Sequence, residues 1–193
     1  SNYGVILKDL GNLKEAELSQ RKAIELKPDF AEAYYNLGII QKNIGKLDEA
    51  EVAIRKAIEL NSDFAEAYIN LGLILKDLSR LEEAEILLRR AIELQPDHAE
   101  AYINLGVILK DLGNLKEAEL STRKAIELNP NFAKGHLNLG LILKDLGKLE
   151  DAELSTRKAI ELNPDLVDAY SNLGGILCDL GKLEDAELST RKA

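Results

Sequence analysis

The sequence predicts an all-α protein built as a solenoid of antiparallel helix pairs. Three observations carry this prediction: one string recurs every 34 residues, each copy holds two stretches with helical apolar spacing, and glycine or proline separates the stretches. The string Ala-Glu-Ala-Tyr-x-Asn-Leu-Gly begins at Ala31, Ala65 and Ala99, and weaker copies begin at Ala133 and Val167. A fixed period of this length is typical of repeat architectures, in which each repeat buries its apolar face against its neighbours.

The repeat accounts for the whole chain of 193 residues. Four full repeats are predicted at 31–64, 65–98, 99–132 and 133–166, with a partial repeat at 1–30 before them and another at 167–193 after them. We therefore expect a single repeat array over 1–193. Because the array begins and ends inside a repeat, we also expect a fragment of a longer protein.

The first stretch of each repeat carries its apolar residues on one helical face. In the third full repeat, the positions i, i+3, i+4 and i+7 hold Tyr102, Leu105, Gly106 and Leu109. A glycine in the middle of a helix costs about 1 kcal/mol relative to alanine. Its recurrence at one place predicts close approach to the alanine of the second helix. The glycines are Gly38, Gly72, Gly106, Gly140 and Gly174, and the alanines are Ala50, Ala84, Ala118, Ala152 and Ala186.

Glycine and proline mark the ends of the predicted helices. Gly113 suits the left-handed conformation that follows a helix, which predicts a turn at 111–114. The second helix of that repeat is expected to stop at Asn129-Pro130, because proline cannot continue a helix. Aspartates that follow proline are expected to cap the next first helix or to favour its dipole. These aspartates are Asp29, Asp97 and Asp165.

Composition excludes several classes of function. The chain has 25 basic and 34 acidic residues, and a net charge of −9 argues against a nucleic-acid partner. No apolar run approaches the roughly 18 residues of a membrane span. One cysteine cannot form an internal disulfide, which favours a reducing, cytoplasmic location. Cys178, His98 and His136 are far apart in the sequence, so we expect no metal, no cofactor and no catalytic site.

The repeat resembles the tetratricopeptide repeat, which also has a 34-residue period. Leu-Gly lies on the first helix, alanine on the second, and proline near the end of most copies. The chain departs from that pattern at the tyrosine place of the first helix, where four repeats have leucine and one has Gln41. The strings Ala-x-Ala-Tyr-x-Asn-Leu-Gly-x-x-Leu-Lys and Ala-Ile-Glu-Leu-x-Pro-x-Phe are similar to those of O-GlcNAc transferase repeats. This resemblance implies a right-handed superhelix whose first helices line a concave face, and it does not imply transferase activity.

The face of each first helix opposite its core residues is expected to line the groove. At about 100° per residue, Glu66, Asn70, Leu73 and Asp77 lie on that side of one helix. One asparagine recurs there in all six repeats, and we call this set the asparagine ladder: Asn2, Asn36, Asn70, Asn104, Asn138 and Asn172. Its apolar neighbours are Val5, Ile39, Leu73, Val107 and Leu141, with Gly175 in the last repeat. Acidic neighbours are Glu32, Glu66, Glu100 and Asp168 on one side and Asp9, Asp77, Asp111, Asp145 and Asp179 on the other.

An asparagine side chain offers both a donor and acceptors, so it can pair with the backbone of an extended peptide. An asparagine ladder of this kind is also what the O-GlcNAc transferase resemblance implies. We therefore predict a non-enzymatic module that binds an extended peptide of neutral or basic charge. The amides could instead bond only within the solenoid or to water.

Three other functions compete with peptide binding along the ladder. A clamp for a terminal carboxylate is disfavoured, because Glu32, Glu66 and Glu100 occupy the place where its lysines would lie. A substrate-recruiting arm of a larger transferase needs a catalytic domain that these residues do not contain. A self-assembling spacer is the third, because the last helix is expected to leave Leu183, Ala186 and Leu188 partly uncovered and open to end-to-end association.

Overall fold

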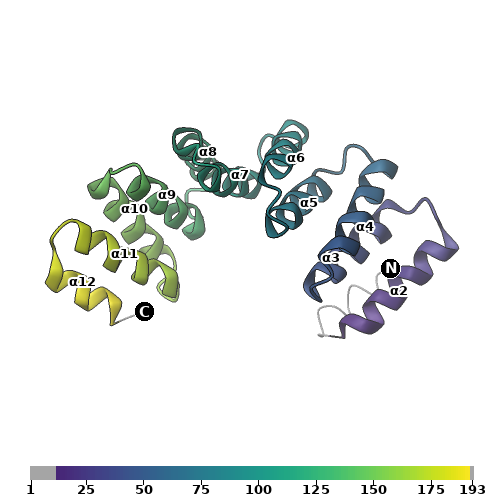
Figure 1. Ribbon diagram of the computed structural model, residues 1–193, viewed down its shortest axis with the longest axis horizontal. Coiled ribbons are helices and arrows are strands. Elements are labelled where there is room, and N and C mark those ends of the chain that lie inside the picture. Colours follow the sequence, from purple (N-terminus) through teal and green to yellow (C-terminus); the bar gives the residue numbers. More distant parts are fainter. Residues whose placement is uncertain (1–11, 192–193) are drawn as a thin grey trace. The chain divides into compact units, whose positions relative to one another are not determined.

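The computed structural model describes residues 12–191, and this part of the chain is entirely helical, with no strand. Its helices are labelled in Figure 1. The bounds are α2 Leu13–Leu26, α3 Ala31–Asn43, α4 Leu47–Leu60, α5 Ala65–Asp77, α6 Leu81–Leu94, α7 Ala99–Asp111, α8 Leu115–Leu128, α9 Ala133–Asp145, α10 Leu149–Leu162, α11 Val167–Asp179 and α12 Leu183–Thr190. Each first helix begins at the first residue of a predicted repeat. The prediction of an all-α fold made of helix pairs is confirmed.

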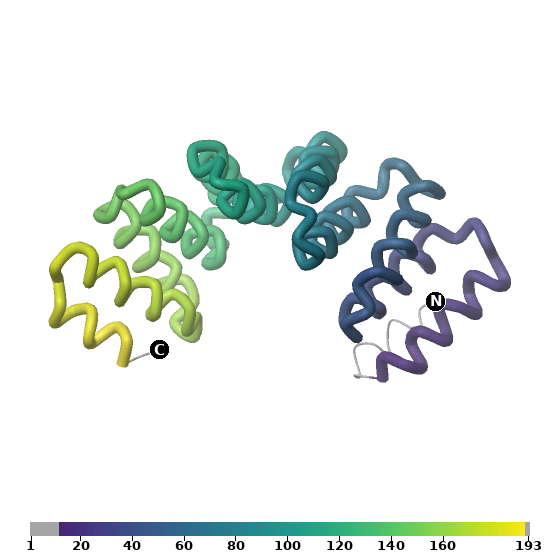
Figure 2. Tube along the Cα trace, in the orientation of Figure 1, coloured from purple at the N-terminus to yellow at the C-terminus, as the bar shows by residue number. Residues whose placement is uncertain are grey.

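The chain divides into two compact units, which we call unit 1 (residues 1–96) and unit 2 (residues 97–193). In unit 1, α3 packs against α4 and α5 against α6, while α2 contacts α3 and α4 contacts α5. Unit 2 repeats this pattern with the pairs α7 and α8, α9 and α10, and α11 and α12. The tube in Figure 2 follows each pair as an antiparallel hairpin. That 1–193 forms one array stays a prediction.

The mid-helix glycines are the points of closest approach within each pair. A Cβ placed on Gly72 would lie 3.0 Å from Leu88 Cγ and 3.4 Å from the Ala84 carbonyl oxygen. A Cβ on Gly140 would lie 3.2 Å from the Ala152 carbonyl oxygen and closer still to Thr156 Oγ1. The predicted close packing is confirmed. The side chain in contact, however, belongs to the residue four positions after the alanine, which contributes its carbonyl.

The helix ends follow the glycine signals but not the aspartate signals. Gly113 has φ +81, as the turn prediction requires, and Ser79 takes the same left-handed conformation with φ +61. Of the two roles expected for Asp29, Asp97 and Asp165, capping of the first helices is wrong, and a favourable interaction with the helix dipole stays a prediction. The N-cap residue comes one position later, and no side chain caps these three helices. Asn163 Oδ1 instead accepts a hydrogen bond from the Asp165 amide at 3.1 Å, which closes the turn before α11.

Candidate functional site

The asparagine ladder lies on the first helices of both units. Asn36 and Asn70 belong to α3 and α5, which contact each other in unit 1. Asn104, Asn138 and Asn172 belong to α7, α9 and α11, and α9 contacts both of the others in unit 2. All five side chains are partly buried. Asn2, Val5 and Asp9 lie outside the described residues.

In unit 1, the fold itself uses one amide of the ladder. Asn70 Nδ2 donates to Tyr35 Oη at 3.0 Å and to the Glu66 carbonyl oxygen at 2.9 Å. The ring of Tyr35 packs against Phe64, with centroids 4.8 Å apart, which helps to hold the hydroxyl in place. Internal hydrogen bonding, the alternative considered for the ladder as a whole, therefore occurs at Asn70.

In unit 2, the ladder has unmet hydrogen-bonding capacity. Asn104 Nδ2 is buried and has no acceptor within the described part of the chain. The side chains of Asn138 and Asn172 likewise form no hydrogen bond with any described residue. For Asn138 and Asn172, the residues at the place of Tyr35 are Ile103 and Leu137, whose side chains cannot form a hydrogen bond. A buried donor without a partner costs free energy, and within the ladder this cost applies to Asn104.

The apolar neighbours of the ladder are present as expected. Ile39, Leu73, Val107 and Leu141 are partly buried beside the asparagines. Gly175 replaces them on α11, where a Cβ would meet Lys144 Nζ at 3.2 Å. The glycine thus leaves space for a lysine side chain to lie beside the ladder.

The aspartates beside the ladder are exposed and are paired unequally. In unit 2, Lys144 Nζ lies 3.2 Å from Asp179, and Lys110 Nζ lies 3.4 Å from Asp111 and 4.0 Å from Asp145. In unit 1, Asp77 forms no ion pair with any described residue. The acidic row is therefore partly neutralised in unit 2, by lysines that sequence reasoning did not place there.

Glutamates on the second helices form ion pairs both within their own helix and with a lysine of the next repeat. The i, i+4 pairs Glu119–Arg123 and Glu153–Arg157 form at 2.9 Å. Each glutamate also accepts a hydrogen bond from the lysine that precedes the next second helix, Lys148 at 2.7 Å or Lys182 at 2.6 Å. These lysines, together with the arginines, hold the pKa of both carboxyls below its ordinary value of 4.5. The glutamates are only 13–14% exposed, so the pairs connect neighbouring repeats and are not merely a solvated face.

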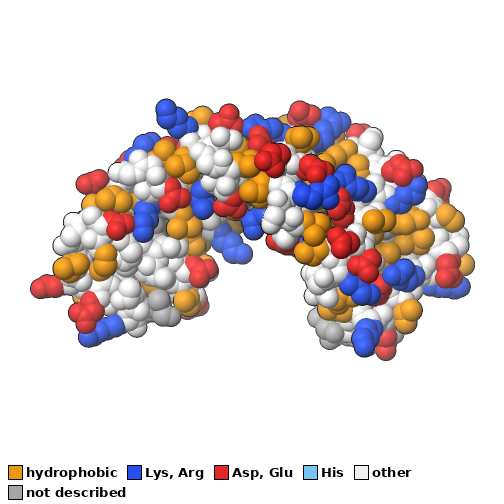
Figure 3. All heavy atoms as spheres, in the orientation of Figure 1, with side chains coloured by type: hydrophobic (Ala, Val, Ile, Leu, Met, Phe, Trp, Pro, Cys, Tyr) orange, Lys and Arg blue, Asp and Glu red, His pale blue; other side chains and the backbone are white. Residues whose placement is uncertain are grey.

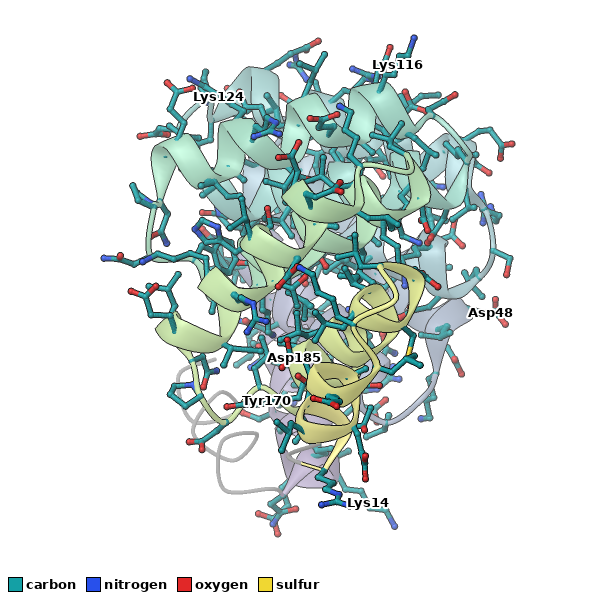
Figure 4. The ribbon with its side chains drawn as sticks, turned by 90° about the vertical axis from the view of Figure 1, so that its left-hand side faces the viewer. Lys14, Asp48, Lys116, Lys124, Tyr170 and Asp185 are labelled. Carbon is teal, nitrogen blue, oxygen red and sulfur yellow. The ribbon has the colours of Figure 1, made fainter. Side chains whose placement is uncertain are left out.

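Sequence reasoning missed a row of exposed aliphatic side chains on the second helices. Its members are 59–70% exposed and recur every 34 residues: Leu18, Val52, Ile86, Leu120, Leu154 and Leu188. Three of them border hollows between successive second helices, of about 540 Å³ at Val52, 460 Å³ at Leu154 and 410 Å³ at Leu188. In Figure 4, the last of these hollows lies at the labelled Tyr170 and Asp185. The sequence contains a signal for this row, because an aliphatic residue recurs every 34 residues on the charged side of each second helix.

Family models match most of the sequence. A model described as the middle TPR-like domain of cilia and flagella-associated protein 70 matches residues 9–127. Two tetratricopeptide-repeat models match residues 133–166 and 156–187. The chain belongs to the tetratricopeptide-repeat family. No curated protein sequence matches it.

Solved structures of other tetratricopeptide-repeat proteins share the fold. MamA is 27% identical with a TM-score of 0.76, over 83% of this chain and 94% of MamA. YrrB, described as a TPR protein with an unusual peptide-binding site, is 26% identical with a TM-score of 0.71, over 90% of this chain and 89% of YrrB. PilW, a type IV pilus biogenesis factor, has a TM-score of 0.91 over 97% of this chain and 87% of its own, at 21% identity. The likeness to PilW therefore concerns the fold alone.

Three further features of this tetratricopeptide-repeat chain concern metal-ligating side chains, the cysteine and the length of the helices. No group of three or more His, Cys, Asp or Glu side chains among residues 12–191 is placed to hold a metal ion. Cys178 is exposed on α11. None of the described helices is long and apolar enough to cross a membrane.

Proposed function

We propose that this chain is a protein–protein interaction module that binds an extended peptide segment along the asparagine ladder. The observation that carries the proposal is the unmet hydrogen-bonding capacity of unit 2, at Asn104, Asn138 and Asn172. Asn36 in unit 1 likewise forms no side-chain hydrogen bond with the described residues. A peptide backbone offers both the donors and the acceptors that these amides need.

Helix spacing supports an extended ligand. Packed helices lie about 8–10 Å apart, and an extended chain advances about 3.3 Å per residue. Neighbouring asparagines of one unit would then meet every third peptide unit. Side chains of Leu73, Val107 and Leu141 would supply apolar contact between these points. Such a grip depends on backbone groups, so it tolerates many ligand sequences.

Charge supports a neutral or basic ligand. Asp77 in unit 1 has no ion pair within the described residues, and Glu66 and Glu100 are exposed on the other side of the ladder. In unit 2, Lys110 and Lys144 reduce the acidity of the aspartate row. The peptide-binding site named for YrrB and the ladder implied by the O-GlcNAc transferase resemblance agree with this proposal.

An exposed residue of the last helix favours a second candidate, the self-assembling spacer. Leu183 of α12 is 67% exposed, whereas its counterpart Leu149 is partly buried; Ala186, which we expected to be uncovered, is buried. Leu188 is 59% exposed, but its counterparts in the other repeats are 67–70% exposed, so Leu183 alone favours an end-to-end contact. The third candidate, a substrate-recruiting arm of a larger transferase, rests on the resemblance of the repeats alone.

A peptide-array screen on paired variants tests the proposed function. One variant carries Asn104→Ala, Asn138→Ala and Asn172→Ala, and the control carries Asn70→Ala, whose amide is already bonded within the fold. We expect the triple variant to lose at least tenfold in affinity for peptides that the unchanged chain binds, and the control to lose less than threefold. Helical content measured by circular dichroism verifies that both variants fold.

Two results would contradict the proposal. Equal peptide binding by the triple variant and the unchanged chain would remove the ladder from the site. No binding by any of the proteins, combined with a solution mass that rises with concentration, would favour the spacer.

A further inference from the structure

A hollow in unit 1 lies between α2, α3 and α4, on the side of the second helices. It has a volume of about 540 Å³, and its apolar lining comes from Tyr34, Leu37, Val52 and Ala53. Val52 is 70% exposed, so the apolar lining reaches the surface. Figure 3 shows hydrophobic side chains gathered on the face over α2 and α4, with charged side chains around them.

Gln41 gives this hollow a feature that the related hollows of unit 2 lack. Its side chain is 3% exposed, it lines the hollow, and its Oε1 is buried without a donor among the described residues. The same place in the other full repeats and in the last one holds Leu75, Leu109, Leu143 and Leu177. A buried acceptor without a partner is costly, and a ligand that donates to it would remove that cost.

The unpaired charge of the hollow is negative. Arg21 and Lys56 line it, but both are engaged in ion pairs on their own helices, at 2.7 Å with Glu17 and Glu59. Asp48 and Glu49 also line it, are exposed, and form no ion pair with any described residue. The occupant that fits is therefore cationic, carries hydrogen-bond donors and has an apolar stem.

We propose that the hollow binds an arginine side chain from a basic segment of a partner protein. The methylene stem packs on Leu37 and Val52, one guanidinium N–H donates to Gln41 Oε1, and the others face Asp48 and Glu49. Arginine suits these acceptors better than lysine, because its planar guanidinium presents five donors in a fixed fork. A second copy of this chain is disfavoured as the partner by its net charge of −9.

This site is separate from the asparagine ladder. At about 100° per residue, Gln41 and Asn36 lie about 140° apart around α3. A ligand in the hollow and a peptide on the ladder would contact opposite sides of the same helix. Binding at the two sites can therefore be measured independently.

Titration of the full chain with the peptide acetyl-Leu-Arg-Leu-amide tests the site. Side-chain amide NMR signals follow Gln41, and the peptide acetyl-Leu-norleucine-Leu-amide has the same apolar stem without the cation. We expect the arginine peptide to shift the Gln41 signal in a saturable way and the norleucine peptide to leave it unchanged. Equal shifts with both peptides would overturn the role of the guanidinium.

Two variants and a matched control complete the test. Gln41→Leu introduces the residue that the other repeats carry, and Asp48→Asn with Glu49→Gln removes the unpaired charge. Each should raise the Kd of the arginine peptide at least tenfold, which corresponds to about 1.4 kcal/mol. The control, Glu150→Gln with Asp151→Asn, makes the same charge change on α10 and should alter the Kd less than twofold. An unchanged Kd in Gln41→Leu, or an equal rise in the control, would overturn the proposal.

Discussion

Units 1 and 2 are built from the same repeat, but different side chains contact the mid-helix glycines and the asparagines in each unit. In unit 1, the mid-helix glycines face Ile54 and Leu88, and Tyr35 holds the amide of Asn70. In unit 2, the corresponding glycines face threonines, and no tyrosine occupies the place of Tyr35. These threonines are Thr122, Thr156 and Thr190. Helix pairs with the same position in the repeat therefore form different side-chain contacts and hydrogen bonds.

The difference between the units shows that recurrence of a residue does not imply recurrence of its role. Asn70 and Asn138 occupy the same place in their repeats, yet one is bonded within the fold and the other has no partner among the described residues. What changes is the side chain at the preceding first helix, Tyr35 in one case and Ile103 in the other. The hydrogen bonding of a repeated residue thus depends on the side chain beside it.

The largest difference is expected between alanine substitutions at two mid-helix glycines, Gly140 of unit 2 and Gly72 of unit 1. In Gly140→Ala the new Cβ meets Thr156 Oγ1, which is bonded to the Ala152 carbonyl at 2.8 Å and cannot move without losing that bond. We expect a loss of about 2–3 kcal/mol, in spite of the better helix propensity of alanine. In Gly72→Ala the Cβ meets the flexible Leu88 at 3.0 Å, and we expect a loss of less than about 1 kcal/mol.

Chemical denaturation of the full chain, with native-state hydrogen exchange to assign the loss to a unit, measures both glycine variants. Equal losses in the free energy of unfolding would show that Thr156 and Leu88 move equally easily to accommodate the new Cβ.

Acid is expected to weaken unit 2 through its bridged glutamates. The bonds from Lys148 and Lys182 lower the pKa of Glu119 and Glu153 in the folded state. A carboxyl with a lowered folded pKa contributes stability that is fully present above the ordinary value of 4.5 and is lost as pH falls through the folded value. Each glutamate should contribute about 0.5–1 kcal/mol near neutral pH, because its lysine partner is almost half exposed.

Urea denaturation between pH 7 and pH 3 measures this contribution. Glu153→Gln should lower the free energy of unfolding at pH 7 and make its decline with acid shallower. An unchanged pH profile in the variant would mean that the bridge adds nothing to the fold.

Two threonines of unit 2 should respond differently to valine. Thr122 Oγ1 is buried and has no partner in the described residues, whereas Thr156 Oγ1 is bonded to Ala152. Thr122→Val should therefore raise the free energy of unfolding by about 1 kcal/mol, since it removes an unsatisfied group without changing the shape. Thr156→Val should leave it unchanged or lower it slightly. Thermal unfolding of the two variants side by side decides this, and equal shifts would reject the distinction.

The smallest effect is expected at Tyr35. Tyr35→Phe removes the hydroxyl that accepts from Asn70, so the amide keeps only its hydrogen bond to the Glu66 carbonyl oxygen. We expect stability to fall by about 0.5 kcal/mol and peptide affinity at unit 1 to rise a few fold. Isothermal titration with a peptide taken from the array measures the gain. No gain in affinity would indicate that the hydrogen bond between Asn70 and Tyr35 does not limit peptide binding at the ladder.

Helix positions were predictable because glycine and proline act locally. Gly113 and Pro130 mark helix ends wherever the rest of the chain lies, and the 34-residue period repeats those marks. The aspartate caps were not predictable in the same way, because Asp165 precedes the N-cap position and its amide bonds to Asn163. Such a turn depends on backbone angles that a residue pattern does not specify.

The helices that carry the asparagines were predictable, but the hydrogen bonds of the asparagines were not. The asparagines of α3, α5, α7, α9 and α11 are partly buried, and the groove that they are predicted to line stays a prediction. The Asn70–Tyr35 bond joins residues 35 apart on different helices, so it depends on how those helices pack. The Glu119–Lys148 bridge has a regular signal that was overlooked, because a glutamate and a basic residue recur 29 residues apart.

The constant 29-residue bridge also bears on how the length of the chain can evolve. Glu119 pairs with Lys148, and Glu153 pairs with Lys182 in the same way. Deletion of one whole repeat, residues 133–166, would bring Lys182 to the sequence distance from Glu119 that Lys148 has now. Unequal recombination between copies can therefore shorten or lengthen unit 2 without creating a mismatched junction, and selection can adjust the number of repeats to the length of the partner.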